Sequence, residues 1–488
     1  MPTLLEILKL IGVIFMALMI LNVMILVHEW GHFLAARWRG LKVDKFQIWF
    51  GKPIWKKTYN GVQYGLGCIP AGGFVALPQM APMEAIEGRS ENEEPLPPIK
   101  PLDKIIVAVA GPLFSFMLAV VFAFLVWMAG RPIMEPENPT QIGYIRPDMP
   151  VAQSGLRVGD IICKIDGKPV NRWEGQVSSV RWGIVSSEKE KTTFTVERNG
   201  QLMDFDVAPI REEPKAGSRN WAARTVEWIF GRPPLRQVGL DHVSTTRVDQ
   251  VLPNSPAAEA GIKEADVVSA VDGDPVQHHL QLIHHIQKGQ GQPVKLSLQR
   301  GTEVVEVTVT PRRPDKPKDA QNYMTGIAFG QERRPMTYLH QTPFEQIRES
   351  VQAMKNLLGA ITSRKSDISA SHMGGPVMIV RIYTNFLSVP DAWRWILWFS
   401  VILNVNLAVL NMLPFPVLDG GHITMAVIEW IRRRPLNVRV LEYVQTACVL
   451  LVFSFFIMVT LKDVGDLAIK DKDVEFFPRS AQPQAGTQ

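Results

Sequence analysis

The stretch that decides the fold is LIGVIFMALMILNVMILVHEWGHFLA, residues 10–35. Its first part, residues 10–27, carries no charge, and about 20 mainly apolar residues are enough to cross a bilayer as a helix. The stretch then continues into HEWGH, His28 to His32. Because ionisable side chains are costly inside a membrane, three of them close together in one spanning helix indicate a shared function.

Three further apolar stretches, 105–129, 393–413 and 440–461, can each cross a bilayer. We therefore expect four transmembrane helices. The first has the position of a signal peptide, but it lacks a basic start and carries HEWGH, so we expect it to be retained. A buried core helix in place of one of the first two spans is the alternative.

Basic residues predict the orientation of the spans. Seven Lys and Arg between residues 37 and 57 face only one acid, Asp44, and Arg432, Arg433 and Arg434 lie between the third and fourth spans. Because cytoplasmic loops carry an excess of positive charge, both regions are expected in the cytoplasm. Residues 131–391 and both termini are then periplasmic, in a bacterial inner membrane, and the HEWGH end of the first span faces the cytoplasmic side.

Composition excludes other classes of partner and site. The net charge is only +5, and no basic run is interleaved with aromatic residues, so we expect no nucleic-acid partner. The three cysteines, Cys68, Cys163 and Cys448, are far apart and form no CxxC pair. A disulfide framework and a thiolate metal site are therefore not expected, and any metal must use His and carboxylate ligands.

HEWGH has the HExxH spacing that suits zinc. Positions i and i+4 share one face of a helix, so His28 and His32 can bind one Zn²⁺ while Glu29 acts as general base. A catalytic zinc usually has three protein ligands, and the stretch NMLPFPVLDGGH, residues 411–422, offers the third. We expect Asp419 to be this ligand; the alternative makes Asp419 a helix cap and leaves His422 as a bystander or as the ligand.

A repeated segment lies between the second and third spans. PDMPVAQSGLRVGDIICKIDGKPV, residues 147–170, recurs as PNSPAAEAGIKEADVVSAVDGDPV, residues 253–276, and each copy leads into a hairpin pattern with alternating apolar residues. The second copy has Ala265 where the first has Gly159. Two homologous β-rich modules follow, and their sequence resembles the circularly permuted PDZ domains of bacterial proteases.

HExxH in the first span followed by N-x-x-P-x-P-x-L-D-G resembles the site-2 protease family, in particular its bacterial branch with four spans and tandem PDZ domains. The resemblance covers nearly the whole chain. It implies that His28, His32 and Asp419 bind zinc, that Glu29 is catalytic and that Asn411 contacts substrate. It implies single-pass membrane substrates, namely anti-sigma factors and remnant signal peptides. Ser115 stands where the family motif A-G-P-x-x-N has Asn, so the role of that Asn is in doubt here.

The expected fold is thus membrane α-helical, with four spans and two PDZ modules inserted between the second and third. Its segments are 1–130 with two spans, HExxH and a β-hairpin loop; 131–215 and 232–313 as the two PDZ domains; 335–391 as an extracytoplasmic amphipathic helical segment; 392–465 with two spans and the LDG motif; and 466–488 as a flexible tail.

Four shorter segments have predictions of their own. Residues 46–77 have hairpin patterns around Asn60-Gly61, for which we expect either a loop that pairs with substrate or a lipid-anchored loop. Residues 344–361 repeat apolar side chains at helical spacing, which predicts an amphipathic helix on the outer membrane face. Residues 81–101 are predicted to be a linker, and residues 238–240 are a weak candidate for a carboxylate-binding loop of a PDZ domain.

The leading hypothesis is an intramembrane zinc endopeptidase. A second is a membrane-anchored scaffold whose PDZ pair recruits periplasmic partners and whose metal is structural. A third is a peptidase acting on soluble peptides, which would need a site that faces water. The residues alone leave open whether the PDZ pair captures peptides or acts as a size filter.

Overall fold

The computed structural model describes residues 4–80, 99–133, 140–211, 229–244, 246–313, 322–329, 337–387, 389–434, 436 and 438–468. Four of its helices are long and apolar enough to cross a membrane: α1 (Leu4–Trp38), α3 (Pro101–Ala129), α10 (Ala392–Asn411) and α12 (Val438–Ala468). These four candidate membrane helices coincide with the four expected spans. Residues 81–98 of the predicted linker and residues 469–488 of the predicted tail lie outside the described residues.

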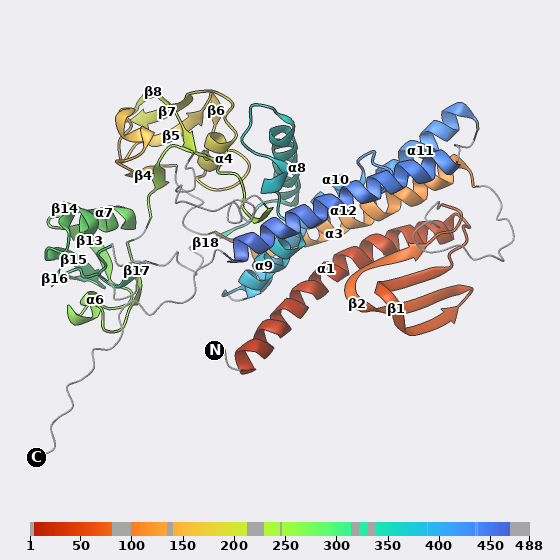
Figure 1. The fold of residues 1–488 in the computed structure, drawn as a ribbon, viewed down its shortest axis with the longest axis horizontal. Coiled ribbons are helices and arrows are strands. Elements are labelled where there is room, and N and C mark those ends of the chain that lie inside the picture. Colours follow the sequence, from red (N-terminus) through yellow and green to blue (C-terminus); the bar gives the residue numbers. More distant parts are fainter. Residues whose placement is uncertain are drawn as a thin grey trace, which may run out of the picture.

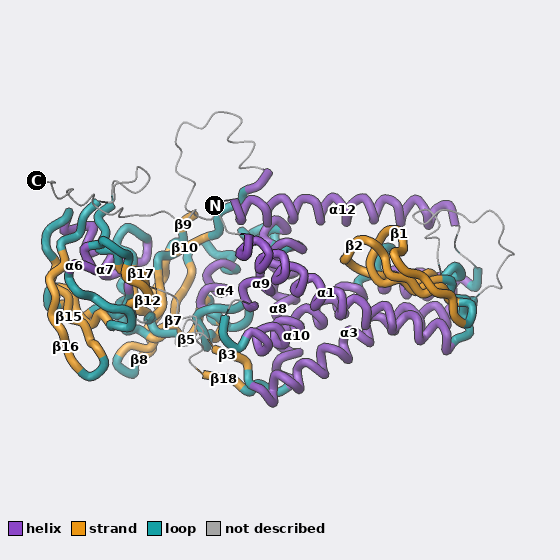
Figure 2. Tube along the Cα trace, turned by 90° about the horizontal axis from the view of Figure 1, so that it is seen from below, coloured by secondary structure: helices purple, strands orange, loops and turns teal. Residues whose placement is uncertain are grey.

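Helix α3 is the centre of the helical part, with α1, α10 and the shorter α11 (Asp419–Arg432) packed against it. Its small residues Ala119 and Ala123 are fully buried with Val401 and Val405 of α10, and small side chains let helix backbones approach closely. Helix α12 runs in roughly the same direction as α3 and α10 but stands apart from them (Figures 1 and 2). Only 6% of its spanning window is buried, so α12 is the span that the bundle holds least.

Strands β1 (Lys45–Tyr59) and β2 (Val62–Ala76) form the hairpin expected over residues 46–77. Asn60 and Gly61 both have positive φ, as a two-residue hairpin turn requires. Phe46 and Val62 pack with Phe33 and Ala36 of α1, which fixes the hairpin beside the HEWGH helix. Figure 2 shows this hairpin beside one end of the helices and the β-rich modules at the other.

Two β-rich modules follow α3. Each has a four-stranded antiparallel sheet of the same order, β6-β5-β7-β8 in the first and β14-β13-β15-β16 in the second. The first contains β4 (Ile142–Ile145), η2 (Pro150–Gln153), β5 (Ile161–Ile165), β6 (Lys168–Pro169), α4 (Val180–Val185), β7 (Thr192–Arg198), β8 (Gln201–Val207), β9 (Ile210–Arg211), β10 (Arg236–Gln237) and β11 (Leu240–His242). The second contains β12 (Val248–Val251), α6 (Pro256–Glu259), β13 (Val267–Val271), β14 (Asp274–Pro275), α7 (His279–Gly289), β15 (Val294–Arg300), β16 (Glu303–Val309) and β17 (Ile327–Phe329).

The structure differs from the expected boundaries of these modules, 131–215 and 232–313. Strand β11 pairs with β4, and Val238 and Leu240 are buried in the core of the first module, so residues 236–242 complete that module. The weak candidate loop 238–240 therefore lies in the core of the first module. Strand β17 pairs with β12 and extends the second module to residue 329. Strand β3 (Arg131–Ile133) pairs instead with β18 (Thr337–Leu339), outside both modules.

The segment after the modules contains the predicted amphipathic helix. Helix α8 (Pro343–Thr362) buries Met354, and its Ile347 and Val351 pack with α3 and α10, while Gln346 donates from Nε2 to the carbonyl of Ala123 at 3.1 Å. Arg172 of the first module pairs with Glu349 of α8 at 2.7 Å. Helix α8 thus joins the first module to the helical bundle. The short helices η3 (Ala370–His372) and α9 (Pro376–Leu387) lead from it to α10.

The sequence repeat is also a repeat of one buried ion pair. Arg198 binds both carboxylate oxygens of Asp160 at 2.7 Å, and Arg300 binds both oxygens of Asp266 at 2.8 Å. Both Asp side chains are almost completely buried. In each copy the same arginine also donates to the carbonyl of a glycine, Gly155 or Gly261. A bidentate pair of this kind fixes the geometry of both partners, which accounts for the recurrence of Gly and Asp at one constant offset.

The position that differs between the copies, Gly159 and Ala265, has positive φ in both, +97° and +72°. A Cβ at residue 159 would meet no atom within 4 Å, so the cost of alanine there comes from the backbone alone. We expect Ala265→Gly to stabilise the second module by about 1 kcal/mol and Gly159→Ala to destabilise the first by a similar amount, since the left-handed region costs about 1–2 kcal/mol for a residue with a Cβ. Hydrogen exchange of the sheet amides in the full chain would measure both changes. Slower exchange in the first module after Gly159→Ala would contradict this explanation.

Candidate metal centre

Three side chains from two helices converge in the helical part, towards the end that carries the β1–β2 hairpin. His28 and His32 lie one turn apart on α1, and Asp419 is the first residue of α11. His28 Nε2 lies 3.2 Å from His32 Nε2 and 3.2 Å from Asp419 Oδ2, and His32 Nε2 lies 3.3 Å from Asp419 Oδ1. The predicted ligand set is therefore brought together in space, with its ligand atoms all within 4.8 Å of one another.

The other ring nitrogen of each histidine is held by the second span, α3. His32 Nδ1 donates to the carbonyl of Val107 at 2.8 Å, and His28 Nδ1 lies 3.0 Å from Ser115 Oγ. Because a carbonyl only accepts hydrogen bonds, the proton of neutral His32 is on Nδ1, and its Nε2 presents a lone pair to the cluster. This is the arrangement in which a metal-binding histidine is oriented by an outer hydrogen bond.

The geometry fits a zinc ion. Zinc binds nitrogen and oxygen ligands at about 2.0–2.2 Å in tetrahedral sites, which separates neighbouring ligand atoms by about 3.3–3.5 Å. The separations of 3.2, 3.2 and 3.3 Å agree with that value. Asp419 Oδ2 is also buried with no hydrogen-bond partner among the described residues, which a metal bond would satisfy. Two imidazoles and one carboxylate leave a fourth position open, as in catalytic zinc sites.

Two glycines allow α1 and α3 to meet at this depth. A Cβ on Gly111 would lie 2.2 Å from His32 Nε2, and a Cβ on Gly31 would lie 2.4 Å from the carbonyl oxygen of Ala110. Neither position can carry a side chain in this packing. Gly111 belongs to the AGPLFS motif, so the first half of that motif makes room for His32 while its last residue, Ser115, contacts His28.

Asp419 is positioned by the non-helical stretch that follows α10. The helix ends at Asn411, and residues 412–418, with Pro414 and Pro416, turn the chain back into α11. Cβ atoms on Gly420 and Gly421 would lie about 2 Å from the carbonyl oxygens of Met412 and Phe415, so the turn packs tightly on the start of α11. Asp419-Gly420-Gly421 therefore supplies the candidate ligand and the two glycines that allow this close packing.

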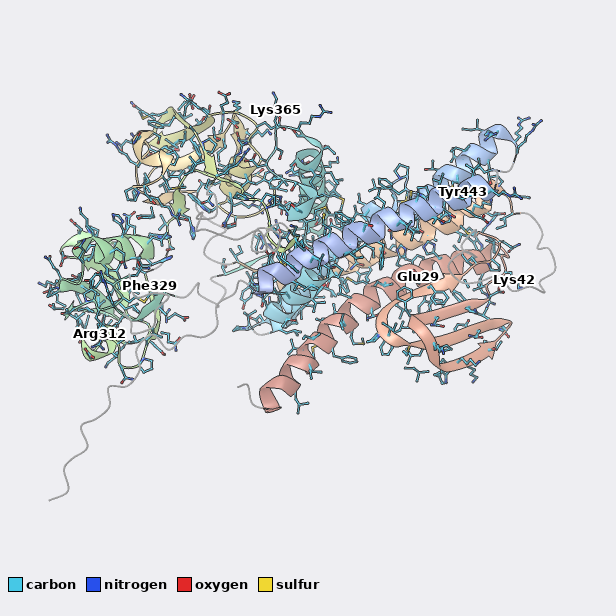
Figure 3. The ribbon with its side chains drawn as sticks, in the orientation of Figure 1. Glu29, Lys42, Arg312, Phe329, Lys365 and Tyr443 are labelled. Carbon is cyan, nitrogen blue, oxygen red and sulfur yellow. The ribbon has the colours of Figure 1, made fainter. Side chains whose placement is uncertain are left out.

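Glu29 lies where α1 passes strand β2 (Figure 3). Strand β2 passes close to its side chain, because a Cβ on Gly73 would lie 4.0 Å from Glu29 Cγ. Glu29 is thus beside the histidines but outside the group of three ligand atoms, as a general base must be.

The remaining candidate residues have separate places. Asn411 Nδ2 lies 3.3 Å from His28 Nε2, so Asn411 borders the ligand set. His422 does not belong to the group of ligand atoms formed by the described residues, which favours Asp419 over the alternative ligand. Ser115 is fully buried and contacts His28, a role that the sequence did not reveal. The one available signal was its position in a motif of the second span.

Known proteins resemble this chain over most of its length. The sequence profile of peptidase family M50 matches residues 16–455. The Regulator of sigma E protease of Salmonella typhi is 28% identical over 442 residues, which cover 87% of this chain and 92% of that protein. A Vibrio cholerae protein whose name assigns it to the zinc metalloproteases is 26% identical over 444 residues, or 86% of this chain and 91% of that protein.

Among solved structures, the PDZ domain of the SdrC-like protein from Listeria monocytogenes is 21% identical and covers 19% of this chain and 92% of that domain, with a TM-score of 0.16. The family match is the stronger finding because it includes both the HExxH helix and the LDG stretch. Together with four helices able to cross a bilayer, it shows that the chain belongs to peptidase family M50, the site-2 proteases, and is a zinc metalloprotease.

Proposed function

We propose that this enzyme cuts single-pass membrane proteins within or beside their transmembrane segments. The observation that carries the proposal is the convergence of His28, His32 and Asp419 between helices long and apolar enough to span a bilayer. The relatives named as regulators of sigma E suggest the substrate class: an anti-sigma factor whose cytoplasmic fragment is released for envelope stress signalling, with remnant signal peptides as a second class.

In this proposal His28, His32 and Asp419 hold the zinc ion, with Ser115 and Val107 orienting the two imidazoles. Zinc in such a site lowers the pKa of its water to about 7 and polarises a carbonyl group. Glu29 accepts the proton of the attacking water and passes it to the leaving amine. The side-chain amide of Asn411, 3.3 Å from His28 Nε2, is a donor close enough to contact the substrate backbone.

Strand β2 supports a route for presenting the substrate. A transmembrane helix satisfies its own backbone groups, so its scissile stretch must become extended before water can attack it. Val75 and Gly73 of β2 lie against Glu29, and the β1–β2 ladder contains several register shifts between residues 45 and 55. We infer that the extended substrate lies along this hairpin, where strand pairing would replace the lost helical hydrogen bonds.

The β-rich modules are proposed to be PDZ domains in the periplasm, with the HEWGH end of α1 towards the cytoplasm. The repeated motif supports the first assignment, and the positive charge after α1 and after α11 supports the second. Since α8 joins the first module to α3 and α10, that module is attached to the helical part. They either exclude bulky substrates or capture a trimmed end.

A Glu29→Gln variant should retain zinc and lose cleavage. The amide keeps the size of the side chain but cannot accept the proton, so we expect turnover to fall by about 10²- to 10⁴-fold. Zinc content would be measured by elemental analysis, and cleavage would be measured on a single-span anti-sigma factor in liposomes.

Asp419→Ala is the matched control, because it should lose both zinc and cleavage. Full cleavage by Glu29→Gln would refute the general-base role. A cellular function that survives in Glu29→Gln although cleavage is lost would favour a scaffold with a structural metal. Cleavage of a soluble peptide as fast as the membrane substrate would favour an ordinary peptidase.

Ser115→Ala should weaken zinc binding without removing any ligand. Loss of an outer hydrogen bond to a ligating histidine typically costs about 10- to 100-fold in metal affinity, and Ser115 Oγ makes such a bond to His28. The measurement is a titration of the purified protein with a zinc chelator. Ser400→Ala is the control: Ser400 is a buried serine of α10 that bonds Tyr383 at 2.9 Å and does not contact the ligands. Equal zinc affinities for the two variants would contradict the role of Ser115.

A further inference from the structure

A small apolar pocket lies between α11 and the beginning of α12, with a volume of about 320 Å³. This is near the lower end of the range of about 300–1,000 Å³ found for ligand pockets. The mechanism above makes no use of it. Of the described residues, those that line it are Pro414, Pro416, Gly421, Thr424, Met425, Ile428, Arg432, Leu436, Val440, Leu441 and Val444.

Arg432 is the one charged side chain among these lining residues, and it is the last residue of α11. The exposed Arg433 and Arg434 follow it directly. Arg433 ends α11 in the left-handed conformation, where glycine is usual. Because this position carries arginine and not glycine, it adds a positive charge to the hairpin. The pocket is therefore apolar along its length and strongly positive at one end.

The acidic residues of this hairpin do not cancel that charge. Residues 428–444 contain four arginines and two glutamates, Glu429 and Glu442. Glu429 is already paired with Lys104 of α3 at 2.8 Å and accepts a hydrogen bond from the backbone of Leu436. An excess of positive charge thus remains for an external anion.

Two exposed aromatic residues place this end of the hairpin at the depth of lipid headgroups. Trp430 of α11 is 65% exposed and Tyr443 of α12 is 78% exposed. Figure 3 labels Tyr443 on α12. Tyr and Trp are enriched at the interface between membrane and water, because one part of each ring system is apolar and another is polar. The arginines lie in the same part of the chain as these aromatics.

We propose that the pocket binds one anionic phospholipid, with an acyl chain in the apolar part and the phosphate on Arg432. Basic pockets between membrane helices bind anionic headgroups, and the guanidinium group matches phosphate with two parallel hydrogen bonds.

The bound lipid would also brace the metal centre. Pro414 and Pro416 form part of the pocket wall and belong to the stretch that carries the chain from Asn411 to Asp419. Gly421 of the wall lies two residues after the ligand. A lipid in the pocket would therefore contact the turn that carries Asp419 and limit its movement.

The test is lipid retention by the full chain, purified in detergent and measured by native mass spectrometry. Dioleoyl phosphatidylglycerol and dioleoyl phosphatidylethanolamine would be added at equal concentration, because they share acyl chains and differ in net charge. Wild type should retain phosphatidylglycerol preferentially. Arg432→Gln should lower its affinity about fivefold, the loss expected for one arginine at a membrane surface. It should weaken phosphatidylethanolamine less, because the ammonium group of that lipid already offsets its phosphate. Lys57→Gln, which removes one charge from the β1 strand, is the matched control and should have no effect.

Ile428→Trp fills the pocket and should reduce retention of both lipids, with circular dichroism to check folding. Equal retention of the two lipids by wild type, or unchanged phosphatidylglycerol binding in Arg432→Gln, overturns the proposal. So does complete competition by inorganic phosphate at the same concentration, because phosphate has the charge without the chain. None of these readouts depends on proteolysis, so the result is independent of the proposed substrate.

Discussion

The structure depends on one electrostatic constraint: two imidazole lone pairs and a carboxylate are directed at the same small volume. With the Nδ1 proton of His32 committed to the carbonyl of Val107, its Nε2 faces His28 Nε2 at 3.2 Å and Asp419 Oδ1 at 3.3 Å. Such electron-rich atoms at this separation repel one another unless a cation lies between them. A zinc ion held by these three side chains would therefore support the fold as well as the chemistry, because it would join α1 to α11.

This constraint explains where the chain uses glycine and proline. Helices α1 and α3 must approach closely enough for Val107 and Ser115 to reach the histidines, and Gly31 and Gly111 permit it. The backbone between α10 and α11 is not helical. Inside a membrane such a backbone is tolerated only where it is buried in protein or lines a water-filled cavity. Gly420 lets that turn close on the start of α11. Glycines therefore surround the candidate ligands, because the backbones of neighbouring segments approach closely there.

The ligands could be predicted from the sequence because each belongs to a local pattern. His28 and His32 follow helical spacing, and Asp419 is an unexplained carboxylate in a broken apolar segment. Ser115 could not be assigned, because its contact with His28 depends on how two helices align across 87 residues of sequence. The predicted boundary of the first module left out residues 236–242 for a similar reason. Strand β11 pairs with β4 although most of the module lies between them in the sequence, and no local pattern specifies that partner. Short-range periodicity predicts elements and ligand spacing, whereas pairing of distant segments is decided by packing.

Helix α12 is attached to the rest of the protein mainly by polar contacts near its C-terminal end. Arg232, in the chain between β9 and β10, donates to Asp463 and Asp466 of α12 at 2.8 Å, and the other oxygen of Asp463 accepts from the backbone amides of Gly375 and Met378. Asp463 is almost completely buried, and removing one partner of a buried ion pair is strongly destabilising. Since the rest of α12 is little buried, this junction and the connection to α11 determine its position. A few polar contacts therefore join the chain beside the first module to the last span. The side chains His28, His32 and Asp419 lie instead among the more closely packed helices α1, α3 and α11.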